Sequence, residues 1–177
     1  AAHGLGVRIE SLAYLPGHAF QVAAATMAGQ FLGARDYRRA RQSIWMACLV
    51  GGGLMISAGV LFYFGAAMLT HLFLGQQTKD AAAIAIPLLR LVSFSMPSLA
   101  LTMILTGALR GAGDTRWPLL FTFIGLLGIR IPLAYYFAWY LELGVLGAWY
   151  AMVIDLLVRS VLVAIRFYRG RWLNIQV

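Results

Sequence analysis

The chain has 177 residues, of which 62% are hydrophobic and 11% are charged. Soluble domains are about one half apolar and about one quarter charged, so this composition excludes an ordinary soluble domain. The net charge is +8, from 14 basic and 6 acidic residues. The basic residues mostly flank apolar stretches, where membrane topology explains them better than nucleic-acid binding does. We therefore expect an all-α integral membrane protein, whose length allows five or six spans of about 20 residues.

Five apolar spans follow one another along the chain. They cover roughly residues 5–33, 43–74, 82–109, 118–140 and 145–167. Prolines lie inside three of them, which membrane helices tolerate when neighbouring groups or water satisfy the freed carbonyls. The pattern predicts five transmembrane helices.

The first span carries a stripe of polar residues on an otherwise apolar helix. The stripe consists of Glu10, Tyr14, His18 and Gln21. At about 100° per residue these four side chains share one narrow face, which Ala25 and Ala28 continue toward the next loop. Small residues there would let another helix pack closely, and Pro16 is expected to kink the helix. We interpret the stripe as the lining of a cavity and its four polar residues as candidate contacts for a substrate or a coupling cation.

The connections between the spans differ in charge. The loops after the first and third spans and the C-terminal tail carry nine arginines: Arg35, Arg38, Arg39, Arg41, Arg110, Arg116, Arg166, Arg169 and Arg171. The opposite connections hold Lys79, Asp80 and Glu142. The positive-inside rule then predicts a cytoplasmic C-terminus and a first span that enters from outside, which suggests a further helix upstream. Aromatic residues near the span ends predict an interfacial belt: Trp117, Trp139, Tyr140, Trp149 and Trp172.

A short motif occurs twice. The pattern Gly-x-x-x-Gly-Ala-x-Asp ends the first span at residues 29–36 and the third span at residues 107–114. Glycines four apart allow two helix backbones to approach, the second glycine can end a helix, and the Asp can bond the freed amides of the turn. Because both copies lie at equivalent ends of their spans, we interpret them as an internal repeat.

Ionisable residues within the spans are costly and therefore informative. Asp155 lies near the middle of the fifth span, Arg159 follows it by one helical turn, and Arg130 lies past the middle of the fourth. We interpret these three as a structural charge cluster that braces two helices. Arg90, near the outer end of the third span, either extends to the interface or lines a cavity.

Enzyme motifs are absent from the sequence. Lys79 is the only lysine and follows no phosphate-loop glycine pattern, and neither His-Glu-x-x-His nor Gly-x-Ser-x-Gly occurs. The three histidines are too scattered for a metal site by local spacing, and Cys48 is the only cysteine. We expect neither catalysis nor a bound metal or cofactor.

Several segments resemble the C-terminal half of the MATE (multidrug and toxic compound extrusion) family. They are residues 8–17, 24–34, 109–115, 129–133 and 166–172, and the likeness extends over essentially the whole chain. The resemblance implies helices eight to twelve of a transporter with two six-helix lobes, so that the N-terminal lobe and the seventh helix would be missing. It also implies antiport, in which a cationic or amphipathic compound leaves in exchange for H⁺ or Na⁺ across a bacterial inner membrane.

Acidic residues of this lobe bind the coupling cation in some members of the family, and Glu10 is the acid to which that role would transfer. The tenth-helix counterpart, residues 87–109, contains Arg90 and no acid, which favours H⁺ coupling or a site in the other lobe. Two alternatives remain open. A lipid-linked-sugar flippase of the same superfamily would use Arg90, Arg130 and Arg159 to hold a pyrophosphate. The other is a non-transporting membrane scaffold, against which the two kinked, cavity-type helices argue.

Overall fold

The computed structural model describes the backbone of residues 2–74 and 79–174, and within these the side chains of residues 14–70 and 85–173. Every long element in this part of the chain is a helix, which confirms the predicted all-α class. The elements are α1 (Ala2–Gly33), α2 (Tyr37–Leu74), α3 (Lys79–Gly111), α4 (Arg116–Phe123), η1 (Ile124–Arg130), α5 (Ile131–Tyr135), η2 (Tyr136–Tyr140), α6 (Gly144–Tyr168) and η3 (Arg171–Asn174).

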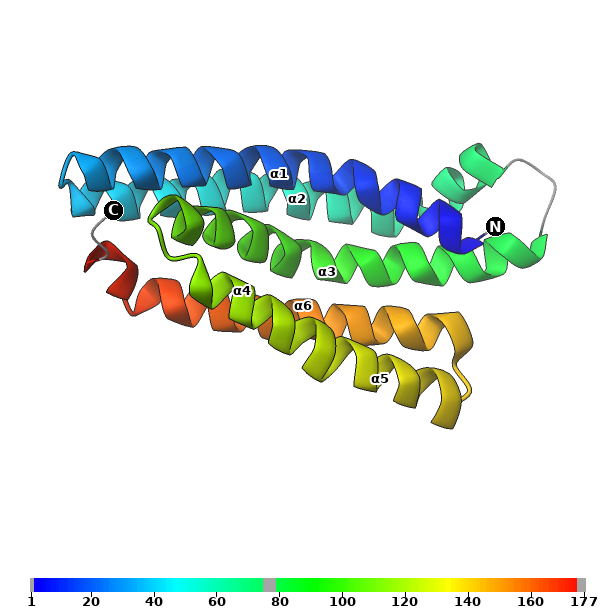
Figure 1. Ribbon diagram of the computed structural model, residues 1–177. Coiled ribbons are helices and arrows are strands. Elements are labelled where there is room, and N and C mark those ends of the chain that lie inside the picture. Colours follow the sequence, from blue (N-terminus) through cyan, green and yellow to red (C-terminus); the bar gives the residue numbers. More distant parts are fainter. Residues whose placement is uncertain (1, 75–78, 175–177) are drawn as a thin grey trace.

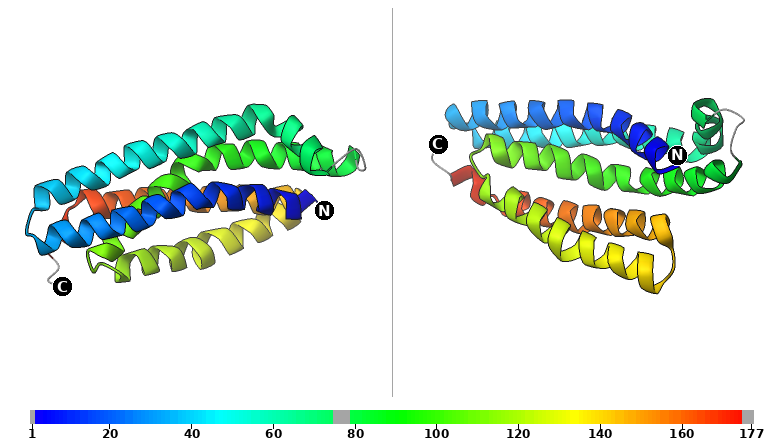
Figure 2. Two further views of the ribbon diagram at one scale, coloured as in Figure 1. Left: turned by 90° about the horizontal axis from the view of Figure 1, so that it is seen from above. Right: turned by 45° about the vertical axis from the view of Figure 1, so that its right-hand side comes forward.

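The helices form two groups. Figure 1 shows α1, α2 and α3 side by side, with α6 and the α4–η2 stretch below them. Contacts between the groups run mainly from α3 to α6, while the α4–η2 stretch packs chiefly on α6. The two views in Figure 2 show the same arrangement. The α4–η2 stretch is therefore peripheral, and α3 and α6 form the spine of the bundle.

Membrane-spanning length and composition are met by four helical stretches of the described residues. These are Tyr37–Thr70, Ala85–Gly111, Arg116–Tyr140 and Gly144–Tyr168. The helix α1 is also long, with 32 residues. Its described part is less apolar because it carries His18, Gln21 and Gln30. In a bilayer such a helix needs protein or water beside its polar face.

The fourth stretch is not a regular α-helix. Two of its segments, η1 and η2, are π-helical, and the amide of Ile131 donates to the carbonyl of Leu126, five residues earlier. Pro132 follows directly and has no amide hydrogen to continue the α-helical pattern. The sequence pattern placed a proline-containing helix here but did not predict its wider turns.

The small-residue interior explains why the first three helices pack closely. Ala24 and Ala28 of α1, Ala40 of α2 and Ala108 of α3 are fully buried in one apolar cluster. Small side chains let helix backbones approach, which is how helices associate in lipid without a hydrophobic driving force between them. The small residues of α1 predicted that another helix packs closely against it, and in the structure that helix is α3.

The repeated motif has the same backbone in both copies. The amides of Ala34, Arg35 and Asp36 bond the carbonyls of Gln30, Leu32 and Phe31 at 2.9–3.0 Å. In the second copy the amides of Ala112, Gly113 and Asp114 bond the carbonyls of Ala108, Arg110 and Leu109 at 2.8–3.0 Å. Each helix ends at the second glycine, and the left-handed residue follows two positions later, at Arg35 (φ 57°) and Gly113 (φ 81°). This geometry is that of a Schellman-type helix end.

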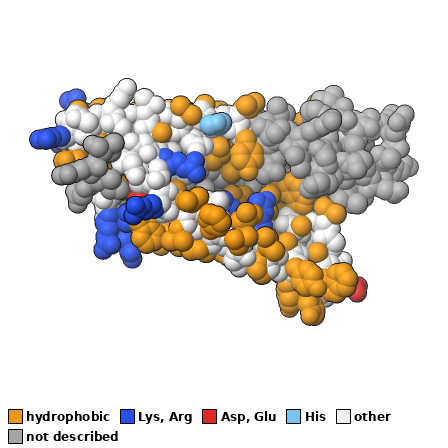
Figure 3. Space-filling model, viewed as in Figure 1, with side chains coloured by type: hydrophobic (Ala, Val, Ile, Leu, Met, Phe, Trp, Pro, Cys, Tyr) orange, Lys and Arg blue, Asp and Glu red, His pale blue; other side chains and the backbone are white. Residues whose placement is uncertain are grey.

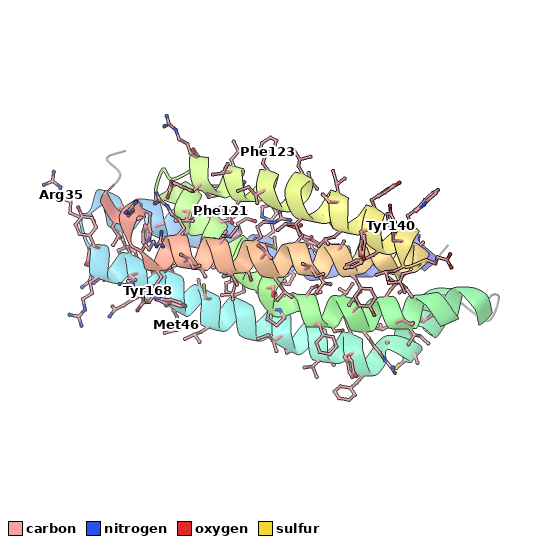
Figure 4. The ribbon with its side chains drawn as sticks, turned by 90° about the horizontal axis from the view of Figure 1, so that it is seen from below. Arg35, Met46, Phe121, Phe123, Tyr140 and Tyr168 are labelled. Carbon is pink, nitrogen blue, oxygen red and sulfur yellow. The ribbon has the colours of Figure 1, made fainter. Side chains whose placement is uncertain are left out.

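The three basic segments lie together. Figure 1 places the α1–α2 loop, the α3–α4 loop and the C-terminal segment at one end of the bundle, and Figure 3 shows several of the blue basic side chains at that end. Figure 4 places Arg35 at that end and Tyr140 at the opposite one. The fold thus separates the charged connections from the others, as a membrane topology requires.

The interpretation of all five aromatic residues as an interfacial belt is wrong for two of them. Trp149 is 4% exposed and Trp172 is fully buried. The Trp172 indole stacks on Phe167, with 4.9 Å between ring centroids, and its Nε1 donates to the Phe167 carbonyl at 2.9 Å. Trp172 therefore fastens the C-terminal segment to the end of α6, while Trp117, Trp139 and Tyr140 remain exposed.

Candidate functional site

The polar stripe of α1 divides into a packed half and an exposed half. Gln21 and Ala25 lie against α3, where the backbones come so close that a Cβ at Gly107 or Gly111 would overlap their carbonyl oxygens. Tyr14 and His18 are exposed on the surface of the bundle. Glu10 belongs to α1, but its side chain lies outside the described residues. Of the predicted contacts, the structure thus leaves Tyr14 and His18 accessible and assigns Gln21 to the helix contact.

The two glycines of the second motif copy make this contact possible. Gly107 sits over the backbone of Gln21 and Gly111 over that of Ala25. In the first copy the roles differ, since Gly29 lies near the carbonyl of Gly111, whereas a Cβ at Gly33 would meet nothing within 4 Å. The repeat therefore preserves the helix end, whereas close backbone packing depends on the second copy.

A buried ion pair lies inside α6. Asp155 has no exposed surface, and the Arg159 guanidinium donates to both of its oxygens, with Nε 3.3 Å from Oδ1. The carboxylate faces η1, where a Cβ at Gly125 would overlap Oδ1. Glycine at this position is therefore what allows the fourth stretch to lie directly over the pair.

The predicted three-residue cluster is only partly formed. The structure brings Asp155 and Arg159 together and gives Arg130, which is half-buried on η1, no ion pair or hydrogen bond with a described residue. The π-helical turns of η1 alter the register of the fourth stretch after Gly125. In the described part of the chain Arg159 is therefore the residue that pairs with Asp155, and Arg130 makes no ion pair with this acid.

A second buried ion pair was not predicted. Nε of Arg166, near the end of α6, donates to Oδ2 of Asp114 at 2.8 Å, and both side chains are nearly buried, at 13% and 4% exposure. The Arg166 guanidinium also lies over the Trp117 ring, 4.9 Å from its centroid. The sequence motif predicted Asp114 as a turn residue. It did not predict Arg166 as its partner, because the spacing of residues within one helix does not show which residues of another helix lie beside it.

Arg90 lies at the surface between α2 and α3. Its guanidinium carbon is 5.6 Å from the centroid of the Tyr63 ring, a cation–π contact. The neighbouring surface of these two helices forms an apolar groove lined by Tyr63, Phe64 and Phe94, among others. No described residue of the α1 stripe lines this groove, so the two candidate sites are separate.

The geometry defines a class of protein. Long apolar helices, charged loops gathered at one end and ion pairs buried inside the bundle are the features of a polytopic membrane protein. Among the described residues, no group of three His, Cys, Asp or Glu side chains is placed to hold a metal ion.

Comparison with known proteins identifies the family. The MatE family model matches residues 1–136, and the chain therefore belongs to the MATE family. It is 30% identical over 174 residues to the probable multidrug resistance protein NorM of Thermotoga maritima, a match that covers 97% of this chain and 37% of that protein. It is 26% identical over 181 residues to the probable multidrug resistance protein YoeA of Bacillus subtilis, covering 100% of this chain and 38% of that protein.

Solved structures show the same fold. The eukaryotic MATE transporter AtDTX14 matches with a TM-score of 0.89 at 21% identity, covering 98% of this chain and 38% of that one. The MATE transporter ClbM, in complex with Rb⁺, matches with a TM-score of 0.82 at 18% identity, covering 98% and 41%. The chain thus spans well under half the length of these relatives.

Proposed function

We propose that this chain is part of the C-terminal lobe, helices eight to twelve, of a cation-coupled exporter of cationic or amphipathic compounds. The observation that carries the proposal is the match of 98% of the chain to a MATE transporter at a TM-score of 0.89. The curated relatives are named as multidrug resistance proteins, which supports the substrate class. The missing partner in this proposal is an N-terminal lobe that forms the other wall of the substrate cavity.

The proposed mechanism is alternating access. A compound binds between the lobes, and the free energy of an opposing H⁺ or Na⁺ gradient shifts the balance between inward-open and outward-open states. Residues 85–111 of α3 contain Arg90 and no acid, which supports H⁺ coupling or a cation site in the other lobe over a Na⁺ site on this helix.

The acid proposed for coupling is Glu10. It heads the stripe whose next members, Tyr14 and His18, are exposed on this bundle, and a second lobe would cover them. A proton and an organic cation both bind a carboxylate, and the binding of one disfavours the binding of the other. Protonation and substrate binding would then compete at Glu10, and such competition is what antiport requires.

The proposed location is the inner membrane of a bacterium, as a multi-pass protein with a cytoplasmic C-terminus. The end of the bundle that gathers the arginines supports this orientation. The flippase alternative has less support, because Asp155 neutralises one of the three arginines on which it depended.

Reconstituted liposomes test the proposal. Liposomes that contain the full-length protein, loaded with a fluorescent cationic dye and given a pH or Na⁺ gradient, should release the dye in a gradient-dependent way. The 177-residue chain alone should not release the dye in this way, because one lobe supplies only one wall of the substrate cavity.

A second experiment tests the role of Glu10. Glu10→Gln in the full-length protein should abolish or flatten the pH dependence of efflux, with expression held equal. Unchanged efflux and unchanged pH dependence in Glu10→Gln would contradict the role of Glu10. Gradient-independent leakage from the full-length protein would contradict the transport proposal itself.

A further inference from the structure

An apolar groove of about 280 Å³ runs along the outer surface between α2 and α3. Its walls are Ile56, Val60, Tyr63 and Phe64 from α2 and Phe94 and Pro97 from α3. Most of these side chains are exposed on the bundle. The groove is therefore open on the surface of the described bundle.

Two residues create the groove. Gly59 forms its floor, because a Cβ there would lie 3.1 Å from Cγ of Met96 and 3.1 Å from the Ser93 carbonyl oxygen. Pro97 lies one turn after Ser93 and cannot donate the amide hydrogen that would normally bond that carbonyl. The helices thus approach at Gly59, and the larger side chains on either side of this contact form the walls.

A cation stands at one end of the groove. Tyr63 connects the two features, since its ring makes edge contacts with Phe64 and Phe94 at 5.3 Å and 5.8 Å and lies under the Arg90 guanidinium. Arg90 is exposed, and no ion pair joins it to a described carboxylate. Among the described residues, no carboxylate accepts from its N–H donors.

The depth of Arg90 matches a lipid headgroup. The helix α3 has 33 residues, or about 50 Å, against a hydrocarbon core of about 30 Å. Arg90 lies 11 residues after Lys79, the first residue of α3, or about 16 Å along the helix, which for a centred helix is about 6 Å inside the hydrocarbon boundary. Its long side chain can reach the phosphate layer, while Val60, Phe94 and Pro97 lie deeper in the membrane.

We propose that this groove binds one phospholipid with an anionic headgroup. One acyl chain lies along Ile56, Val60 and Pro97, and the phosphate accepts hydrogen bonds from Arg90. The almost entirely apolar lining offers nothing to a polar solute, and the unpaired guanidinium complements a negative headgroup. The proposal depends on membrane insertion and is independent of what, if anything, the protein transports.

Native mass spectrometry of the full-length protein in detergent tests the headgroup preference. We expect dioleoylphosphatidylglycerol to be retained in preference to dioleoylphosphatidylcholine, and Arg90→Gln to weaken phosphatidylglycerol binding about fivefold. Arg130→Gln is the matched control, since it removes another intramembrane arginine that forms no ion pair with a described residue, and should leave binding unchanged. Equal retention of the two lipids, or equal loss in both variants, would overturn the proposal.

A second pair of variants tests the groove itself. Val60→Trp fills it and should abolish phosphatidylglycerol retention, whereas Leu61→Trp, at an exposed position that does not line it, should not. A spin label at Val60→Cys, with Cys48 replaced by Ala, should be readily relaxed by O₂ in liposomes. A label shielded from O₂ would mean that another helix of the protein fills the groove, and would overturn the lipid assignment even if Val60→Trp does not fold.

Discussion

Asp114 and Arg166 lie 52 positions apart, and the 2.8 Å hydrogen bond between them joins the end of α3 to the end of α6. The equivalent acid in the first motif copy, Asp36, instead bonds the amide of Arg39 within its own turn at 3.0 Å. The Asp36–Arg39 ion pair is largely exposed, at 37% and 72%. One motif therefore supports two different structures, a local helix cap and a tertiary link.

The first prediction compares these two acids. Asp114→Ala should destabilise the protein by about 3 kcal/mol, because it leaves the buried Arg166 without a counter-charge. Asp36→Ala should cost about 1 kcal/mol, the usual value of a lost helix cap. Thermal unfolding of both variants in the same detergent measures the difference, and equal losses would contradict the tertiary role of Asp114.

The second prediction concerns the glycines of the motif. Gly107→Ala should destabilise the α1–α3 contact by about 1–3 kcal/mol, because the added methyl group overlaps the Gln21 carbonyl. Gly33→Ala is the matched control, since a Cβ there meets nothing within 4 Å and Gly33 is the last residue of α1, where Ala is favoured by up to about 0.5 kcal/mol. Unfolding temperatures should therefore change in opposite directions, and a stable Gly107→Ala variant would show that the helices can separate at no cost.

The third prediction concerns the buried pair in α6. Asp155→Asn and Arg159→Gln should each lower the free energy of unfolding by several kcal/mol, because each leaves the other member of the pair without its partner at membrane depth. The folded yield of each variant should fall as well. The double variant should recover part of the loss, and Arg130→Gln should change stability little. Transport by each folded variant should persist. Normal folding with transport abolished would show that the pair is functional and not a brace.

The fourth prediction tests the orientation of the bundle. With Cys48 replaced by Ala, single cysteines at Ala34 and Leu141, both exposed and in opposite connections, should react with a membrane-impermeant maleimide from opposite sides. In intact cells we expect labelling at Leu141→Cys and protection at Ala34→Cys, as the arginine distribution requires. Disruption of the membrane should expose Ala34→Cys, and the reverse pattern would contradict a cytoplasmic C-terminus.

The sequence predicted the helices well, because an apolar run of spanning length lies within a single helix. Apolar runs of membrane-spanning length placed the stretches that became α2, α3, α4–η2 and α6, and the arginines placed three segments at one end. The spacing of Asp155 and Arg159 predicted their pair, since four residues on a helix bring two side chains to the same face. Each of these inferences needs only the geometry of one helix.

Contacts between helices required the tertiary structure. Packing, and not periodicity, left Arg130 outside the charge cluster, buried Trp149 and Trp172, and paired Asp114 with Arg166. The same is true of the motif glycines, where only the approach of α3 to α1 distinguishes Gly107 from Gly33. The sequence by itself determined that the chain is helical, lies in a membrane and has its charges on one side, because hydrophobicity acts residue by residue. Which polar groups meet was decided by the fold, because such pairs depend on the crossing and rotation of helices that are distant in the chain.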